Sequence, residues 1–130
     1  MAHLSFEYSS NLESSLDMMA FCAVMRDAMH ESGVFPLGGI RVRGTRVDVH
    51  AVASGDPTMG FLDMTLRMGQ GRDKATRQHI TRLIYDTAET WLSPHLADMP
   101  FALSLEIMEI NRAFSEKRFN TLHDFLQTDR

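Results

Sequence analysis

The chain has 130 residues, of which 44% are hydrophobic and 23% are charged, and its formal net charge is −4. This length and composition are typical of one soluble globular domain that can bury a core and gain stability by association. The acidic balance and short basic runs exclude nucleic acid as an expected partner. The longest apolar run, Met18 to Met25, is too short to span a membrane, and the lone Cys22 cannot form an internal disulfide. We therefore expect a cytoplasmic protein without a membrane partner.

The N-terminal part predicts a strand followed by a helix. Residues 3–8 alternate between apolar and polar side chains, which indicates a half-buried strand. Two competing helix caps follow, Asn11 and the pattern Ser14-x-x-Asp17. Apolar side chains, several of them methionines, then recur at helical spacing and predict an amphipathic helix over roughly 14–32. We interpret these methionines as adaptable core filler.

A turn rich in glycine and proline separates this helix from the next strand. Gly33 can take the left-handed conformation that ends a helix, and Pro36 prevents the helix from continuing. Gly38 and Gly39 let the backbone turn or lie close to another group. The chain is therefore expected to fold tightly here.

Ile40 opens the next strand, on which Arg41 and Arg43 are two residues apart and share one face. A guanidinium held on a rigid strand binds carboxylates well, because its planar fork matches two oxygens. A solvated arginine beside a loop is the reading that these residues alone favour. Apolar and polar residues alternate over 46–51, so we expect the second strand of the fold to include these residues. Residues 54–57 form a turn.

The second half of the chain predicts two strands, a long helix and a polar tail. Alternation indicates a third strand over 61–68 and a fourth over 101–107. Between them an apolar stripe predicts a helix that Asp73 can cap and Pro94 ends. The tail reads as a loop and a short helix capped near Asn120.

The element order is β-α-β, turn, β-α-β. It predicts an α/β (α+β) fold in which each β-α-β unit is a right-handed crossover between parallel strands. We expect four main strands in one sheet, two helices on one face and a short C-terminal helix. The two halves indicate a duplication within a single domain, with repeats at about 1–57 and 58–110 and a tail at 111–130. Met-rich alternation fits an uncovered sheet face that needs a partner. Ferredoxin-like domains share this order, so the pattern alone does not choose between the two folds.

Few residues carry chemistry by spacing alone. The six histidines lack metal-ligand spacing, so no metal site is expected. Cys22 lies on an apolar helix stripe and reads as a buried inert thiol. Gly69-x-Gly71 lacks the rest of a dinucleotide or P-loop motif, so no cofactor is expected. Arg72 lies where a strand gives way to a helix, where its guanidinium adds to the positive helix end. Taken alone, it reads as a solvated first-turn residue.

Three segments, 33–43, 64–72 and 103–107, resemble 5-carboxymethyl-2-hydroxymuconate isomerases in their sequence, order and spacing. This family belongs to the tautomerase superfamily, and the similarity extends from His3 to the apolar tail around 122–126. The resemblance implies a duplicated β-α-β tautomerase-type fold and a homotrimer without a cofactor. It also implies an isomerase that moves a proton by a 1,3-allylic keto–enol shift in homoprotocatechuate degradation. The expected substrate is 5-carboxymethyl-2-hydroxymuconate or a similar unsaturated 2-hydroxy polycarboxylate.

The resemblance further implies roles for three residues. In similar isomerases the arginines corresponding to Arg41 and Arg72 bind substrate carboxylates and help to polarise the carbonyl. The family's base is an N-terminal proline that is exposed when the initiator methionine is removed, and this chain has Ala2 at that position. A freed Ala2 would present an α-amine with an ordinary pKa of about 7.7–8.0. If Met1 stays attached, Ala2 is an amide without basicity.

Three alternatives stay open at this point. The protein is a carboxylate binder that has lost its base, a ferredoxin-like regulatory domain, or an enzyme of the same fold with another reaction such as hydrolytic dehalogenation or decarboxylation. Binding without turnover favours the first alternative, and an even-numbered assembly favours the second.

Overall fold

A computed structural model describes residues 1–96 and 98–128. Its helices and strands are, in chain order, β1 (Ala2–Ser9), α1 (Met18–Glu31), β2 (Ile40–Val47), β3 (Gly60–Gly69), α2 (Lys74–Leu92), β4 (Phe101–Ile110) and α3 (Leu122–Thr128). No helix among these residues is long and apolar enough to cross a membrane.

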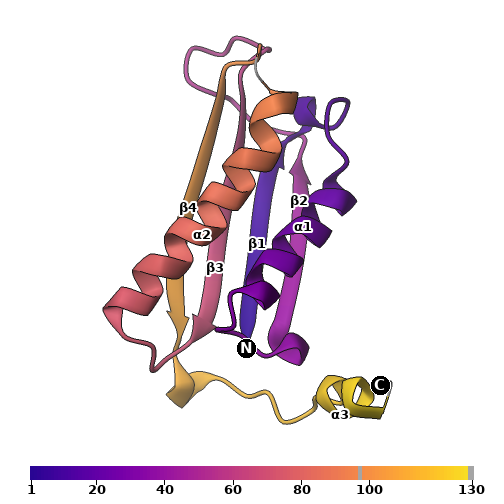
Figure 1. Cartoon of the computed structure of the whole chain (residues 1–130). Coiled ribbons are helices and arrows are strands. Elements are labelled where there is room, and N and C mark those ends of the chain that lie inside the picture. Colours follow the sequence, from indigo (N-terminus) through magenta and orange to yellow (C-terminus); the bar gives the residue numbers. More distant parts are fainter. Residues whose placement is uncertain (97, 129–130) are drawn as a thin grey trace.

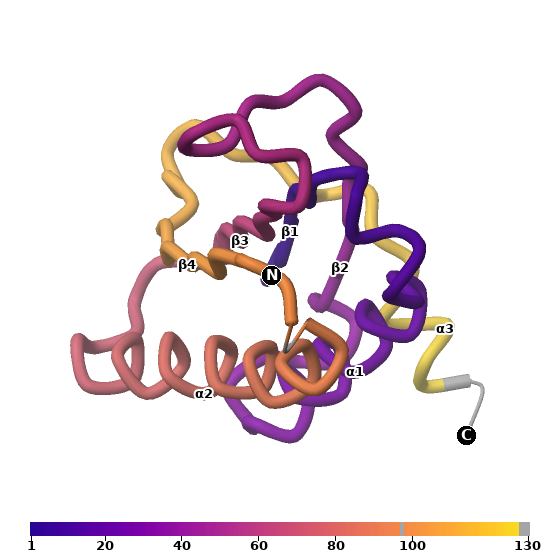
Figure 2. The backbone as a smooth tube through the Cα atoms, turned by 90° about the horizontal axis from the view of Figure 1, so that it is seen from above, coloured from indigo at the N-terminus to yellow at the C-terminus, as the bar shows by residue number. Residues whose placement is uncertain are grey.

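The four strands form one mixed sheet in the order β2-β1-β3-β4. Strands β1 and β2 are parallel, β3 and β4 are parallel, and the central pair of β1 and β3 is antiparallel. Helices α1 and α2 both cover the same face of the sheet (Figures 1 and 2). The predicted architecture of two β-α-β units with helices on one face and a short C-terminal helix is therefore confirmed.

The hydrophobic core lies between the sheet and these two helices. The inward side chains of β1 and β3 meet the apolar stripes of α1 and α2, and the largest fully buried ones are Phe6, Phe21, Leu4, Leu12, Met25, Met29, Leu62, Met64, Leu66, Met68, Ile80 and Ile84. Burial of each such side chain stabilises the fold by about 1.5–3 kcal/mol. The expectation that Met-rich alternation marks the uncovered face is wrong, because Met64 and Met68 are 0% exposed beneath the helices.

The start of α1 shows which of two cap signals is used. The side chain of Asp17 accepts a hydrogen bond from the Ala20 N–H at 3.1 Å, so the helix begins directly after Asp17 and later than predicted. The Asn11 amide instead donates to the carbonyls of Pro57 and Met59, at 3.1 and 2.7 Å. Asn11 therefore fastens a loop rather than a helix.

The second strand is shorter than its alternation predicts. Strand β2 ends at Val47, which pairs with Ser9, the last residue of β1. Beyond this point no neighbouring strand offers hydrogen bonds, and Val49 is 93% exposed. The prediction of a strand continuing to Ala51 is therefore wrong, because alternation records a pattern of polarity and not the presence of a pairing partner.

Three other predicted boundaries are confirmed. Gly33 has a φ of 73° just after α1, a conformation that glycine adopts without steric cost. The Asp73 side chain accepts from the Thr76 N–H at 2.8 Å and caps α2. The Asn120 side chain accepts from the Leu122 N–H at 2.9 Å at the start of α3.

Candidate active site

One end of the sheet brings the predicted site residues together. Strands β1 and β2 begin at this end, and β3 and β4 finish there. In the ladder Ala2 pairs with Ile40 on one side and with Met68 on the other. The N-terminus therefore lies between the start of β2, which carries Arg41, and the end of β3, which leads to Arg72.

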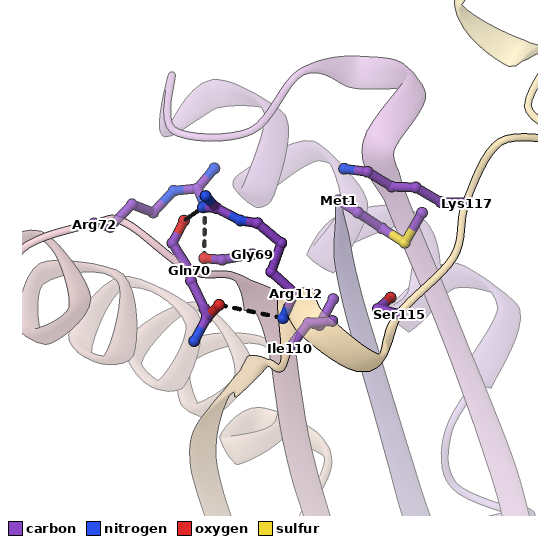
Figure 3. Close-up of a pocket in the computed structure, with 8 residues that line it drawn as sticks. All are labelled: Met1, Gly69, Gln70, Arg72, Ile110, Arg112, Ser115 and Lys117. Atoms are coloured by element: carbon purple, nitrogen blue, oxygen red, sulfur yellow. Dashed lines mark hydrogen bonds between the residues drawn. The ribbon is translucent and has the colours of Figure 1, made fainter.

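A pocket of about 220 Å³ opens at this end of the sheet (Figure 3). The start of the chain, the turn after β3, the end of β4 and the following tail line it, with the residues Met1, Gly69, Gln70, Arg72, Ile110, Arg112, Ser115 and Lys117. Three of these side chains are cationic and none is acidic. A small pocket of this composition favours an anionic ligand.

Arg72 is held by backbone acceptors and not by a carboxylate. Its Nη1 donates to the Gly69 carbonyl and its Nη2 to the Val34 carbonyl, both at 3.1 Å. The guanidinium carbon lies 5.0 Å from the centre of the Phe35 ring. Arg72 is thus fixed in orientation while its full charge stays available to a ligand, so it is not a freely solvated first-turn residue.

Arg41 has a buried nitrogen without a partner. Its Nη1 is buried and makes no hydrogen bond within the described part of the chain. An unpaired buried donor costs about 1–3 kcal/mol, and a charged one costs more. An acceptor supplied by a ligand would satisfy this donor.

The α-amine of Met1 lies among these cations. Burial first, and then the charges of Lys117, Arg72 and Arg41, lower its pKa from the ordinary value of 8.0. The Met1 carbonyl accepts a hydrogen bond from the Gly69 N–H at 3.2 Å. A lowered pKa leaves more of the amine neutral near pH 7, which suits a general base.

The glycine pair before β2 permits this close packing. A Cβ atom on Gly39 would lie 3.3 Å from the Met1 Cα and 3.4 Å from its nitrogen. The predicted close approach is therefore confirmed, and the group that approaches is the N-terminus itself.

Ala2, the residue predicted to carry the base, lies directly behind this amine. Its side chain is 0% exposed, and both neighbouring strands hold its backbone. With Met1 attached, the free amine in the pocket belongs to Met1, and the nitrogen of Ala2 is an amide. The role of Ala2 as the base stays a prediction.

Two cationic residues of the pocket were missed from the sequence. Arg112 follows the end of β4, whose residue Ile110 pairs with Gly69 of β3. Since neighbouring parallel strands end at one edge of a sheet, the position of Arg112 beside Arg72 was within reach of sequence reasoning. The position of Lys117 was not within reach, because it depends on the path of residues 115–121, which have no regular secondary structure.

The described residues offer little else that resembles a reactive centre. No group of three or more His, Cys, Asp or Glu residues among them could hold a metal ion. Burial raises the pKa of the Cys22 thiol, which makes it a poor nucleophile.

The site combines an α-amine of lowered pKa with several cations, at one end of a sheet built from two β-α-β units. These features are those of a protein that binds a small organic acid and moves a proton from one of its atoms to another. The comparisons with known proteins agree with this class. The sequence profile of 5-carboxymethyl-2-hydroxymuconate isomerases matches residues 2–126, and the chain belongs to this family.

Individual relatives cover nearly the whole chain. The Escherichia coli 5-carboxymethyl-2-hydroxymuconate Delta-isomerase is 30% identical over 120 residues, which are 92% of this chain and 95% of that protein. A solved 5-carboxymethyl-2-hydroxymuconate delta-isomerase is 33% identical, with a TM-score of 0.88 over 98% of this chain and 93% of that one. A 5-carboxymethyl-2-hydroxymuconate isomerase from Deinococcus radiodurans R1 is 26% identical, with a TM-score of 0.88 over 96% and 93% of the two chains.

Proposed function

We propose that this protein is an isomerase acting on 5-carboxymethyl-2-hydroxymuconate or a similar unsaturated 2-hydroxy polycarboxylate in homoprotocatechuate degradation. The observation that carries the proposal is the position of the N-terminus, which lies in an acid-free pocket with Arg72 and Lys117, an environment that lowers the pKa of the amine of Met1. The family to which the chain belongs, and the isomerase names of its relatives, support the same reaction.

The proposed reaction needs a base and a set of cations. The neutral α-amine takes the proton of the substrate's 2-hydroxyl group and returns a proton to carbon 5, so that the dienol becomes a conjugated ketone. Arg41 and Arg72 bind substrate carboxylates and stabilise the negative charge that develops on the 2-oxygen. The partnerless Nη1 of Arg41 supports this role, because a bound anion would supply its missing acceptor.

We assign the base to the α-amine of Ala2 after removal of Met1. Ala2 is fixed by strand pairing on both sides, so its freed amine would hold one position in the pocket. Removal of Met1 also enlarges the pocket that Met1 lines and releases the Gly69 N–H from the Met1 carbonyl. That N–H then becomes a further donor for substrate beside Arg72.

The test is isomerisation of 5-carboxymethyl-2-hydroxymuconate followed by ultraviolet absorbance. It compares the chain without Met1, the chain that retains Met1 and an Ala2→Pro variant, each with its N-terminus verified by mass. We expect turnover by the first and third preparations and none by the second. If every preparation binds substrate without turnover, the protein is the carboxylate binder that has lost its base. If no preparation binds or isomerises any such acid, the proposal is wrong.

We also propose that the protein is a cytoplasmic homotrimer. The sheet face that the helices leave uncovered carries both signs of charge, with Arg43 and Arg67 nearer the pocket and Glu7 and Asp63 farther along. Such a face suits head-to-tail contact between copies around a ring. Light scattering coupled to size-exclusion chromatography should give the mass of three chains. A dimer or tetramer would instead favour the ferredoxin-like regulatory alternative.

A further inference from the structure

The segment between β4 and α3, residues 111–121, crosses the pocket end of the sheet and is anchored on both sides (Figure 1). At its start the Arg112 backbone N–H donates to the Gln70 side-chain oxygen, and the Arg112 Nη2 donates to the Gln70 carbonyl, both at 3.2 Å. At its far side α3 packs beside Gly38, where an added Cβ atom would lie only 2.6 Å from the His123 Nδ1. The absence of a side chain at Gly38 therefore lets the tail dock.

Lys117 lies between these two anchors and belongs to the pocket wall. Figure 3 shows its side chain reaching from the tail past Met1, with the ammonium directed toward the side of the pocket that holds Arg72. Its charge acts on the Met1 amine more strongly than the charge of Arg72 does. Lys117 is therefore close to the reacting end of the pocket even though it comes from an irregular segment.

The charge of Lys117 has no counter-charge within the described part of the chain. The four ion pairs found there do not include it, whereas the next residue, Arg118, pairs with Glu116 at 3.2 Å. Two adjacent cations of the tail thus differ in environment. Arg118 is paired with Glu116 in solvent, and Lys117 lies in the pocket wall, unpaired among the described residues.

We propose that Lys117 binds the third carboxylate of the substrate and makes the protein prefer tricarboxylates over dicarboxylates. This inference rests on the proposed function, in which Arg41 and Arg72 serve two carboxylates. A carboxymethyl arm turns about single bonds, and a flexible lysine can follow it where a rigid guanidinium fork cannot. Arg112 has a different task, because its hydrogen bonds to Gln70 hold the tail in place.

The experiment compares Lys117→Met with Arg118→Met, a matched loss of one positive charge at the neighbouring residue. Each variant is assayed with 5-carboxymethyl-2-hydroxymuconate and with 2-hydroxymuconate, which lacks the carboxymethyl arm. For Lys117→Met we expect KM for the tricarboxylate to rise about 10-fold with kcat nearly unchanged, and KM for the dicarboxylate to change less than about 2-fold. Arg118→Met should leave both KM values near those of the parent.

Calorimetric binding of tricarballylate and glutarate gives a readout that does not need turnover. Lys117→Met should weaken the binding of tricarballylate and leave the binding of glutarate unchanged. This result would support the inference even if the protein isomerised nothing. If the parent turns over both substrates and Lys117→Met changes both KM values equally, or neither of them, the inference is overturned while the proposed function stands. If the parent binds neither acid and turns over neither substrate, both the inference and the proposed function are wrong.

Discussion

The two ends of the sheet are built from the same four strands but differ in how their polar groups are hydrogen-bonded. At the end remote from the pocket, the Ser9 hydroxyl accepts from the Phe61 N–H at 3.0 Å and donates to the Asn11 side chain at 2.7 Å. Asn11 in turn donates to the carbonyls of Pro57 and Met59. Every hydrogen bond in this network joins two parts of the chain.

At the pocket end, by contrast, two cationic side chains have groups without partners within the described residues. The Nη1 of Arg41 is buried without an acceptor, and Lys117 takes part in none of the ion pairs found there. Buried polar groups are satisfied in nearly all native structures, so an exception calls for an explanation. The difference supports a division of roles in which the remote end stabilises the fold and the pocket end keeps donors for the proposed substrate.

Among the substitutions that test this difference between the two ends, we expect the largest effect on activity at Arg41. Arg41→Met should lower kcat/KM by about 10²–10³-fold, because under the proposed function it removes a cation that stabilises the developing charge. Thermal unfolding should stay the same or move to a higher temperature, since the variant removes an unpaired buried donor. Steady-state kinetics and calorimetric unfolding measure the two quantities.

Arg43→Met is the matched control for Arg41. Arg43 lies on the same face of β2, but its Nη1 already contacts the His3 Nδ1 at 3.2 Å. We expect a change in kcat/KM of less than about 5-fold. Equal losses of activity in both variants would show that general positive charge on this strand, and not the partnerless Arg41, carries the binding.

Asn11→Ala tests the remote end. The variant removes two hydrogen bonds to backbone carbonyls and one that the Ser9 hydroxyl donates. We expect the free energy of unfolding to fall by about 1–3 kcal/mol with kcat/KM unchanged at a temperature where the variant is folded. Urea unfolding followed by circular dichroism measures the loss. A variant of parental stability and impaired turnover would contradict the division between the two ends.

Features that depend on residues close together in the sequence could be predicted, and features that depend on residues far apart in the sequence could not. The alternation of β1, β3 and β4 and the caps at Asp73 and Asn120 are local signals, and the structure confirms them. Only the resemblance to a known family predicted that Arg41 and Arg72 belong to one site, because their placement at one end of the sheet depends on the strand register. Composition alone left both arginines as solvated surface residues.

The remaining features depend on contacts that no local pattern encodes. Strand β2 stops at Val47 because β1 ends opposite it, and the Met-rich side of β3 faces the helices rather than a partner. Lys117 reaches the pocket only because the tail is anchored at Arg112 and again beside Gly38. Each is a property of chain path and pairing, so it became visible only in the folded structure.

The smallest expected effect is a shift in the pH dependence of the N-terminal amine. Its pKa lies below 8.0 because of burial and then the charges of Lys117, Arg72 and Arg41. A base acts in its neutral form, so kcat/KM of the chain without Met1 should rise with pH as the α-amine of Ala2 loses its proton. Among the three cations Lys117 has the largest effect on the amine of Met1, so Lys117→Met should raise the pKa of the N-terminal amine and move this rise in kcat/KM toward higher pH.

Competitive acetylation of the α-amine at a series of pH values, read by mass spectrometry, reports the same pKa without turnover. In the chain that retains Met1, the midpoint should also lie below 8.0 and rise in Lys117→Met, whereas Arg118→Met should leave it in place. Because Arg118 is paired with Glu116, its loss changes the local field less than the loss of Lys117 does. An unshifted midpoint in Lys117→Met would mean that its ammonium stays in solvent, and the cations of the pocket end would then be reduced to the arginines.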